Sequence, residues 1–91
     1  MAIAHLEFTG LVQGVGFRWF VRQHARALGL AGWVKNEDSG AVRVAVEGDA
    51  KVVADFIAAI RGGPPGARVD AVRELPTSEI GSLSGTFMVM R

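Results

Sequence analysis

The sequence has 91 residues, the length of one small domain, and it contains no cysteine, which excludes disulfides, thiolate metal sites and a thiol nucleophile. The net charge of +1 predicts no strong attraction to nucleic acid or to anionic membranes. No stretch reaches the ~18 consecutive apolar residues that span a bilayer. No basic segment precedes an apolar run at the start, so we expect a cytoplasmic protein without a signal peptide.

Hydrophobic periodicity predicts alternating strands and helices along the whole chain. Leu6 and Phe8 fall on one face of the first strand and His5 on the other, which we expect to meet solvent. Apolar residues then recur at three- and four-residue spacing, as in an amphipathic helix. In chain order, the predicted elements are a strand at 3–12, a helix from Phe17 to Leu28, strands at 33–37 and 41–47, a helix between Asp49 and Gly62, and strands at 68–75 and 86–90.

This order of elements predicts a specific architecture. A β-α-β-β-α-β chain with a short extra strand at its end is typical of the ferredoxin-like split βαβ fold, an α+β sandwich. We expect two helices on one face of an antiparallel sheet, with the other face partly open to water. No repeat, linker or low-complexity segment interrupts the pattern, so we interpret residues 1–91 as a single domain.

The stretch from Gly10 to Arg18 is the candidate binding site. An apolar strand ends at Gln13, two glycines follow within three residues, and a helix begins at Phe17. Glycines let the backbone approach an anion closely, and the amides at a helix start point at it with the positive end of the dipole. Arg18 adds a planar fork of donors that matches phosphate oxygens. The string is neither a P-loop nor a complete dinucleotide fingerprint.

Two side chains have both a functional and a structural interpretation. Arg18 could be a solvated arginine, but a cation in the first helical turn opposes the dipole unless an anion joins it, which favours a phosphate site. Asn36 could be a turn former. Because it shares its strand face with Val34, which we expect to pack toward the helices, it could also face the glycine loop. Trp19 and Trp33 are interpreted as covers for the ends of the first helix.

The types of residue absent from this stretch limit the chemistry. No serine, histidine or aspartate lies near the glycines and Arg18 to act as nucleophile or acid, and no paired carboxylates could hold magnesium. His5 and His24 have no metal-type spacing, and Glu37 and Asp38 are interpreted as turn residues because a carboxylate repels phosphate. A carboxylate leaves phosphorus without protonation, whereas an alkoxide does not. An enzyme with this site would therefore hydrolyse an acyl phosphate, with water as nucleophile.

The combined motif closely resembles the acylphosphatase family. It reads Gly-x-Val-Gln-Gly-Val-Gly-Phe-Arg-x-Phe at 10–20 and Ala-x-x-Leu-Gly-Leu-x-Gly-Trp-Val-x-Asn at 25–36. The resemblance implies that Arg18 and Asn36 are catalytic and that the backbone amides of Val15, Gly16, Phe17 and Arg18 hold the phosphate. It implies hydrolysis of acyl phosphates by a metal-independent enzyme without a cofactor, with inorganic phosphate as product and inhibitor. We expect a monomer with no nucleic-acid or membrane partner.

Two other functions share this expected topology. An RNA-recognition module needs aromatic side chains on the open faces of its central strands, and residues 41–47 contain none. A non-catalytic domain that binds phosphate or another small anion is the remaining alternative. Glu37 is a departure from the family pattern that could lower activity or alter its pH dependence. Met88 and Met90 are expected on the open face of the sheet, without an assigned role.

Overall fold

The computed structural model describes residues 1–83 and 85–90. Its elements follow the order that the sequence predicts. They are β1 (Ala2–Leu11), α1 (Phe17–Ala27), β2 (Ala31–Asn36), β3 (Val42–Gly48), α2 (Ala50–Ile60), β4 (Arg68–Glu74), the short 3-10 helix η1 (Thr77–Glu79) and β5 (Phe87–Met90). Within these residues, no helix is long and apolar enough to cross a membrane.

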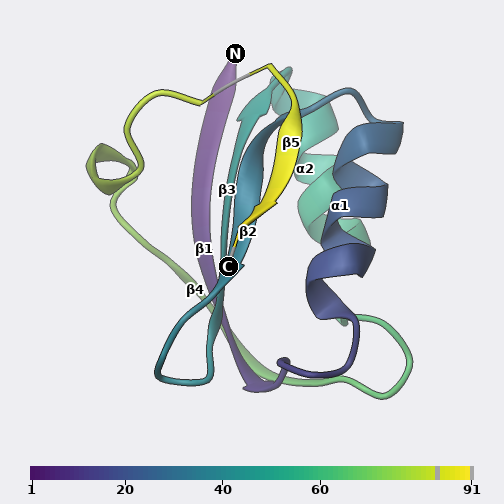
Figure 1. Cartoon of the computed structure of the whole chain (residues 1–91). Helices are drawn as coiled ribbons and strands as arrows, with labels where there is room; N and C mark the ends of the chain where they lie inside the picture. The colour runs from purple at the N-terminus through teal and green to yellow at the C-terminus, as the bar shows by residue number, and fades with distance from the viewer. Residues whose placement is uncertain (84, 91) are drawn as a thin grey trace.

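The strands form one sheet in the order β4-β1-β3-β2-β5, and both helices lie on the same face of it (Figure 1). The predicted α+β, ferredoxin-like fold is therefore confirmed. The expectation of an antiparallel sheet is wrong at one edge, where β5 pairs with β2 in parallel. The reason is topological. β4 runs antiparallel to β1 and therefore in the opposite direction to β2. The chain reverses its direction once between β4 and β5, so β5 runs in the same direction as β2 when it pairs with it at the edge of the sheet.

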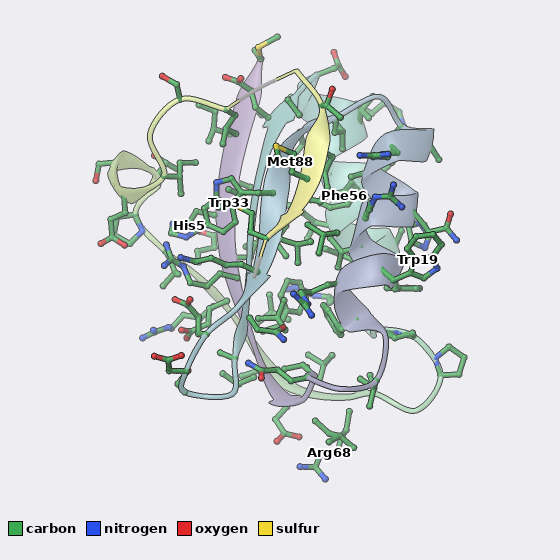
Figure 2. All side chains as sticks on the ribbon, viewed as in Figure 1. His5, Trp19, Trp33, Phe56, Arg68 and Met88 are labelled. Carbon is green, nitrogen blue, oxygen red and sulfur yellow. The ribbon has the colours of Figure 1, made fainter. Side chains whose placement is uncertain are left out.

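The hydrophobic core lies between the helices and the sheet. Phe56 of α2 packs against Phe87 of β5 with ring centroids 6.1 Å apart, on the helix side of the sheet (Figure 2). The predicted helical stripe extends one residue too far, because Leu28 caps α1 and is 40% exposed. The fully buried side chains include Phe8, Phe17, Val21, Val34, Val42, Val44, Val46, Phe56, Ile60 and Phe87.

The opposite face of the sheet is less open than the sequence suggests. His5 was expected to meet solvent, but it is only 1% exposed. Its Nδ1 lies 2.8 Å from the backbone oxygen of Pro76, and Arg43 donates to its Nε2 from Nη2 at 2.7 Å. Trp33 does not cover the first helix. Its ring meets His5 edge-on at 5.9 Å on this face (Figure 2). The segment after β4 returns over this face of the sheet and covers His5, which periodicity predicts to be exposed to solvent.

We predict that Gly32→Ala destabilises the fold. Gly32 pairs with Val46 of β3 and Phe87 of β5, and its φ of 144° is one that residues with a side chain rarely adopt. An added Cβ would also overlap the carbonyl oxygen of Ala45. The strained conformation alone costs about 1–3 kcal/mol. Urea unfolding should show a loss of at least this size.

Gly62→Ala is the matched control for this substitution. Gly62 follows α2, has an ordinary φ, and has no atom within 4 Å of the position of a Cβ. The control should change stability by about 0.5 kcal/mol or less. Equal stability losses in the two variants would contradict a specific requirement for glycine in β2.

Candidate active site

A cavity of about 460 Å³ opens where the loop after β1, the start of α1, the end of β2 and β5 meet. Arg18 and Asn36 both line it, although they are 18 positions apart in the sequence and come from different elements. An adjoining hollow is lined by Arg18, Asn36, Val89 and Met90. The described residues that line the cavity are Val12, Gly14, Gly16, Phe17, Arg18, Trp19, Arg22, Asn36 and Val89.

The glycine loop and the start of α1 contribute Gly14, Gly16, Phe17 and Arg18 to the wall of this cavity. Gly16 is the N-cap residue of α1 in the left-handed conformation, with φ 77°, and it has no side chain to cap the helix. The first turn of α1 also contains no acidic residue. Because the first amides of a helix have no intrahelical acceptor, those at the start of α1 remain available to an anion. The ring of Phe17 is buried 5.2 Å from that of Phe8 and holds the helix start in place.

The four predicted phosphate-binding amides belong to consecutive residues of this loop and helix start. Gly16, Phe17 and Arg18 line the cavity. Val15 lies between the two glycines, but its side chain packs against the core and the residue is not part of the cavity lining. The structure therefore brings three of the four residues to the cavity directly.

The guanidinium of Arg18 lies between the loop and the end of β5. Its Nη1 donates to the backbone oxygen of Met90 at 2.9 Å. Within the part of the chain that the structure describes, Arg18 forms no ion pair with a carboxylate. One carbonyl satisfies one of its five donors, so the remaining donors can bind an anion.

Asn36 ends β2 on the face that the sequence predicted. It shares that face with the buried Val34 and lies opposite Val42 of β3. Its Oδ1 is buried and has no hydrogen-bond partner in the described part of the chain. A buried acceptor without a partner costs about 1–3 kcal/mol. The side chain of Asn36 is thus suited to accept a hydrogen bond from a small molecule in the cavity.

The chemistry of the lining is that of an anion site. It contains two arginines and one asparagine, together with glycine and apolar residues, and none of its side chains is a carboxylate, imidazole, hydroxyl or thiol. Among residues 1–83 and 85–90, no group of three or more histidine, cysteine, aspartate or glutamate side chains is placed to hold a metal ion. The donors that line the cavity match phosphate oxygens and do not match the ligands of a divalent cation.

Gln13 is a residue that sequence reasoning did not single out. Its Nε2 donates to the backbone oxygens of Glu37 and Ala41, at 2.7 and 2.9 Å. These two carbonyls belong to the β2–β3 turn, which begins directly after Asn36. One side chain therefore ties the glycine loop to the strand end that carries the asparagine. A signal was present, because a glutamine at the end of an apolar strand has four hydrogen-bonding positions that need partners.

Glu37, the acid beside Asn36, points to the other face of the sheet. Its Oε1 accepts from Arg43 at 3.0 Å, and its Oε2 lies 3.7 Å from Nζ of Lys35. The hydrogen bond from Arg43 lowers the pKa of Glu37 below its ordinary value, against the raising effect of burial, and the charge of Lys35 lowers it further. The carboxylate is thus paired and does not line the cavity.

The family model for acylphosphatase matches residues 4–87. The chain belongs to the acylphosphatase family. An acylphosphatase of Nitrobacter hamburgensis is 45% identical to it over 76 residues, which cover 84% of this chain and 77% of that protein.

Solved structures give the same result at the level of the fold. The crystal structure of acylphosphatase from Bacillus subtilis has a TM-score of 0.89 and 33% identity, and the match covers 100% of both chains. HypF of T. kodakarensis has a TM-score of 0.81 and 31% identity, and the match covers 98% of this chain but 12% of that one. The fold therefore occurs both in chains of this length and as one part of a much longer protein.

We predict that Gln13→Glu destabilises the protein by about 1–3 kcal/mol. The substitution keeps the shape of the side chain, removes both N–H donors and places carboxylate oxygens against the carbonyl oxygens of Glu37 and Ala41. Gln23→Glu, on the exposed side of α1, makes the same chemical change without these partners. In urea unfolding the control should stay within about 0.5 kcal/mol of wild type. Similar losses in both variants would show that the contact of Gln13 with the turn contributes little.

We also predict that ionised Glu37 raises the free energy of unfolding, and that this contribution is lost when the carboxylate is protonated at low pH. Because its pKa is lower in the folded protein than in the unfolded chain, the contribution is complete above the unfolded pKa and is lost as pH falls through the folded pKa. The difference in unfolding free energy between wild type and Glu37→Gln should therefore be largest at neutral pH and shrink toward about pH 3. Urea titrations across this range measure it. A difference that does not change with pH would contradict the pairing with Arg43.

Proposed function

We propose that this chain hydrolyses the carboxyl–phosphate bond of acyl phosphates by direct attack of water on phosphorus. Its membership of the acylphosphatase family supports the activity. The observation that carries the mechanism is that Arg18 and Asn36 line one cavity, and that no described residue of its lining offers a nucleophile, a general acid or a carboxylate. The backbone amides of Val15, Gly16, Phe17 and Arg18 would hold the phosphoryl group.

The leaving group explains how a site without a nucleophile or a general acid can catalyse hydrolysis. In phosphoryl transfer the negative charge spreads over three equatorial oxygens of a loose transition state. The guanidinium of Arg18 and the uncapped amides of α1 stabilise that charge, because they are fixed donors that need no reorganisation. A departing carboxylate needs no proton, so the reaction requires no general acid. The products are a carboxylate and inorganic phosphate, which would also bind the site as an inhibitor.

Asn36 would orient the attacking water. Its unpartnered Oδ1 can accept a hydrogen bond from a water O–H, which directs a lone pair of that water toward phosphorus. Such orientation lowers the barrier without adding to the affinity for phosphate. We propose that no metal ion is needed, since Arg18 and the amides supply the positive charge that a cation would otherwise bring.

The setting of the reaction is also part of the proposal. We propose a cytoplasmic monomer that acts on small molecules, with neither nucleic acid nor membrane as a partner. The net charge of +1 supports this, because it creates no strong general attraction to polyanions.

We predict that Asn36→Ala separates chemistry from binding. The variant should keep wild-type inhibition by inorganic phosphate, because Arg18 and the amides remain, while kcat for benzoyl phosphate falls by about 10²-fold or more. Arg18→Ala should lose both, since its donors contact the phosphate in the ground state and in the transition state. Steady-state kinetics with phosphate as inhibitor, in excess EDTA, measure the two effects together.

Three results would contradict this assignment. A destabilised but fully active Asn36→Ala would make the residue a turn former. Unchanged phosphate inhibition in Arg18→Ala would place the anion elsewhere. Phosphate binding by the wild type without turnover of any acyl phosphate would favour a non-catalytic anion-binding domain. Thermal melts of each variant show whether a loss of activity reflects unfolding.

A further inference from the structure

Three arginines follow one another along α1 at intervals of four residues, and the middle one has no polar partner among the residues that the structure describes. Arg18 donates to the backbone oxygen of Met90 at one end of β5. Arg26 donates to that of Phe87 at the other end, from Nε at 3.2 Å and Nη2 at 3.1 Å. Arg22 lies between them and makes no hydrogen bond or ion pair with any residue of 1–83 or 85–90.

Arg22 nevertheless has an aromatic partner. Its Cζ lies 5.0 Å from the centroid of the ring of Trp19, so its guanidinium stacks on the indole. Trp19 is 57% exposed, so its ring is accessible to a ligand. Both residues line the same cavity as Arg18 and Asn36. The stack therefore presents the unpartnered donors of Arg22 at the wall of the candidate active site.

The charge balance of this cavity is unfavourable without a second anion. Arg18 and Arg22 are neighbours on the helix surface, and like charges at this spacing destabilise a helix by a few tenths of a kcal/mol. Arg18 also lies in the first turn of α1, where the helix dipole disfavours a cation. Among residues 1–83 and 85–90, none that lines the cavity carries a carboxylate. A phosphoryl group that binds to Arg18 and the amides leaves Arg22 without a counter-charge.

We propose that Arg22 is a specificity residue for the acyl part of the substrate. It would bind a carboxylate or a second phosphate carried by the acyl group, while Trp19 packs against the carbon skeleton between the two anions. The preferred substrates are then acyl phosphates with a second negative charge, in place of simple uncharged acyl phosphates. This proposal depends on the proposed function, because it assumes that the phosphoryl group binds beside Arg18.

The spacing of the two arginines sets the length of the acyl group. Four residues of α-helix advance about 6 Å along the axis. The second anion should therefore lie roughly one helical turn from the phosphoryl group, which corresponds to a few carbon atoms or one aromatic ring. The guanidinium of Arg22 can meet a planar carboxylate with two parallel hydrogen bonds, which an ammonium group cannot do.

The test compares two substrates of the same shape and different charge. 4-Carboxybenzoyl phosphate carries the second anion, and 4-carbamoylbenzoyl phosphate replaces it with a neutral amide. We expect wild type to prefer the carboxylate by roughly three- to tenfold in kcat/KM. Arg22→Gln should bring this ratio to about one, and Arg22→Lys should retain part of it. The measured quantity is the ratio, so a general change in activity does not affect it.

Arg61→Gln controls for the loss of one positive charge. Arg61 is exposed just after α2 and lines none of the described cavities, so this variant should keep the wild-type ratio. A wild-type ratio near one, or an undiminished ratio in Arg22→Gln, would overturn the proposal while leaving the hydrolysis of acyl phosphates intact. An equal fall in Arg61→Gln would also overturn it, because the preference would then reflect net charge alone.

A binding measurement distinguishes failure of this proposal from failure of the proposed function. 4-Carboxybenzylphosphonate and 4-carbamoylbenzylphosphonate cannot be hydrolysed, and calorimetric titration gives their Kd values without any turnover. Wild type should bind the carboxylate more tightly by a factor similar to that in kcat/KM, and Arg22→Gln should lose the difference. If wild type hydrolyses no acyl phosphate but shows this difference in Kd, the second anion site stands and the catalytic proposal fails. Equal Kd values in wild type would refute the site directly.

Discussion

The start of α1 is held uncapped beside the end of β2, and the candidate site depends on this constraint. Gly16 supplies the left-handed residue before the helix and leaves its first amides without a side-chain acceptor. Burial of Phe17 against Phe8 keeps that helix start against the sheet. Gln13 then joins the same loop to the turn after Asn36 through two hydrogen bonds. The amides, Arg18 and Asn36 are thus placed by packing and by backbone contacts before any substrate arrives, which is the condition for electrostatic stabilisation without reorganisation.

The alternation of side chains along β2 keeps the negative charge of Glu37 away from the cavity that Arg18 lines. Asn36 and Glu37 are adjacent in sequence, but successive side chains of a strand point to opposite faces. Asn36 therefore lines the cavity, whereas Glu37 is paired with Arg43 and Lys35 on the other face. Arg43 in turn donates to the buried His5. The face of the sheet opposite the helices thus carries a polar network, and this network pairs the carboxylate of Glu37, which is next to Asn36 in the sequence.

Much of this arrangement could be predicted from local sequence pattern. The glycines placed the loop, Arg18 was expected at the helix start, and the shared parity with Val34 predicted the direction of Asn36. These features depend on neighbours in the chain, where the periods of helix and strand apply directly. The ferredoxin-like order of strands and helices could be predicted for the same reason, because each element has its own local period.

The remaining features depend on contacts between residues that are distant in sequence. Periodicity indicates which side chains share a face, but not which later segment covers it, so His5 was assigned to solvent although Pro76 and Arg43 enclose it. The parallel pairing of β5 with β2 joins residues 55 positions apart, and it brings the carbonyl of Met90 to Arg18. The bridge from Gln13 to the β2–β3 turn is of the same kind. The sequence shows that the side-chain amide of Gln13 needs hydrogen-bond partners. Periodicity does not identify the distant segment that supplies any of these contacts.

The most direct test of the mechanism is the fate of the oxygen atom that water contributes. Benzoyl phosphate is hydrolysed by the wild-type protein in ¹⁸O-labelled water, and the two products are separated and analysed by mass spectrometry. Attack on phosphorus, guided by Asn36 with the charge held by Arg18 and the amides, predicts that the label enters inorganic phosphate and that benzoate remains unlabelled. Label in benzoate would mean that water attacks the acyl carbon, and it would contradict a site built around the phosphoryl group.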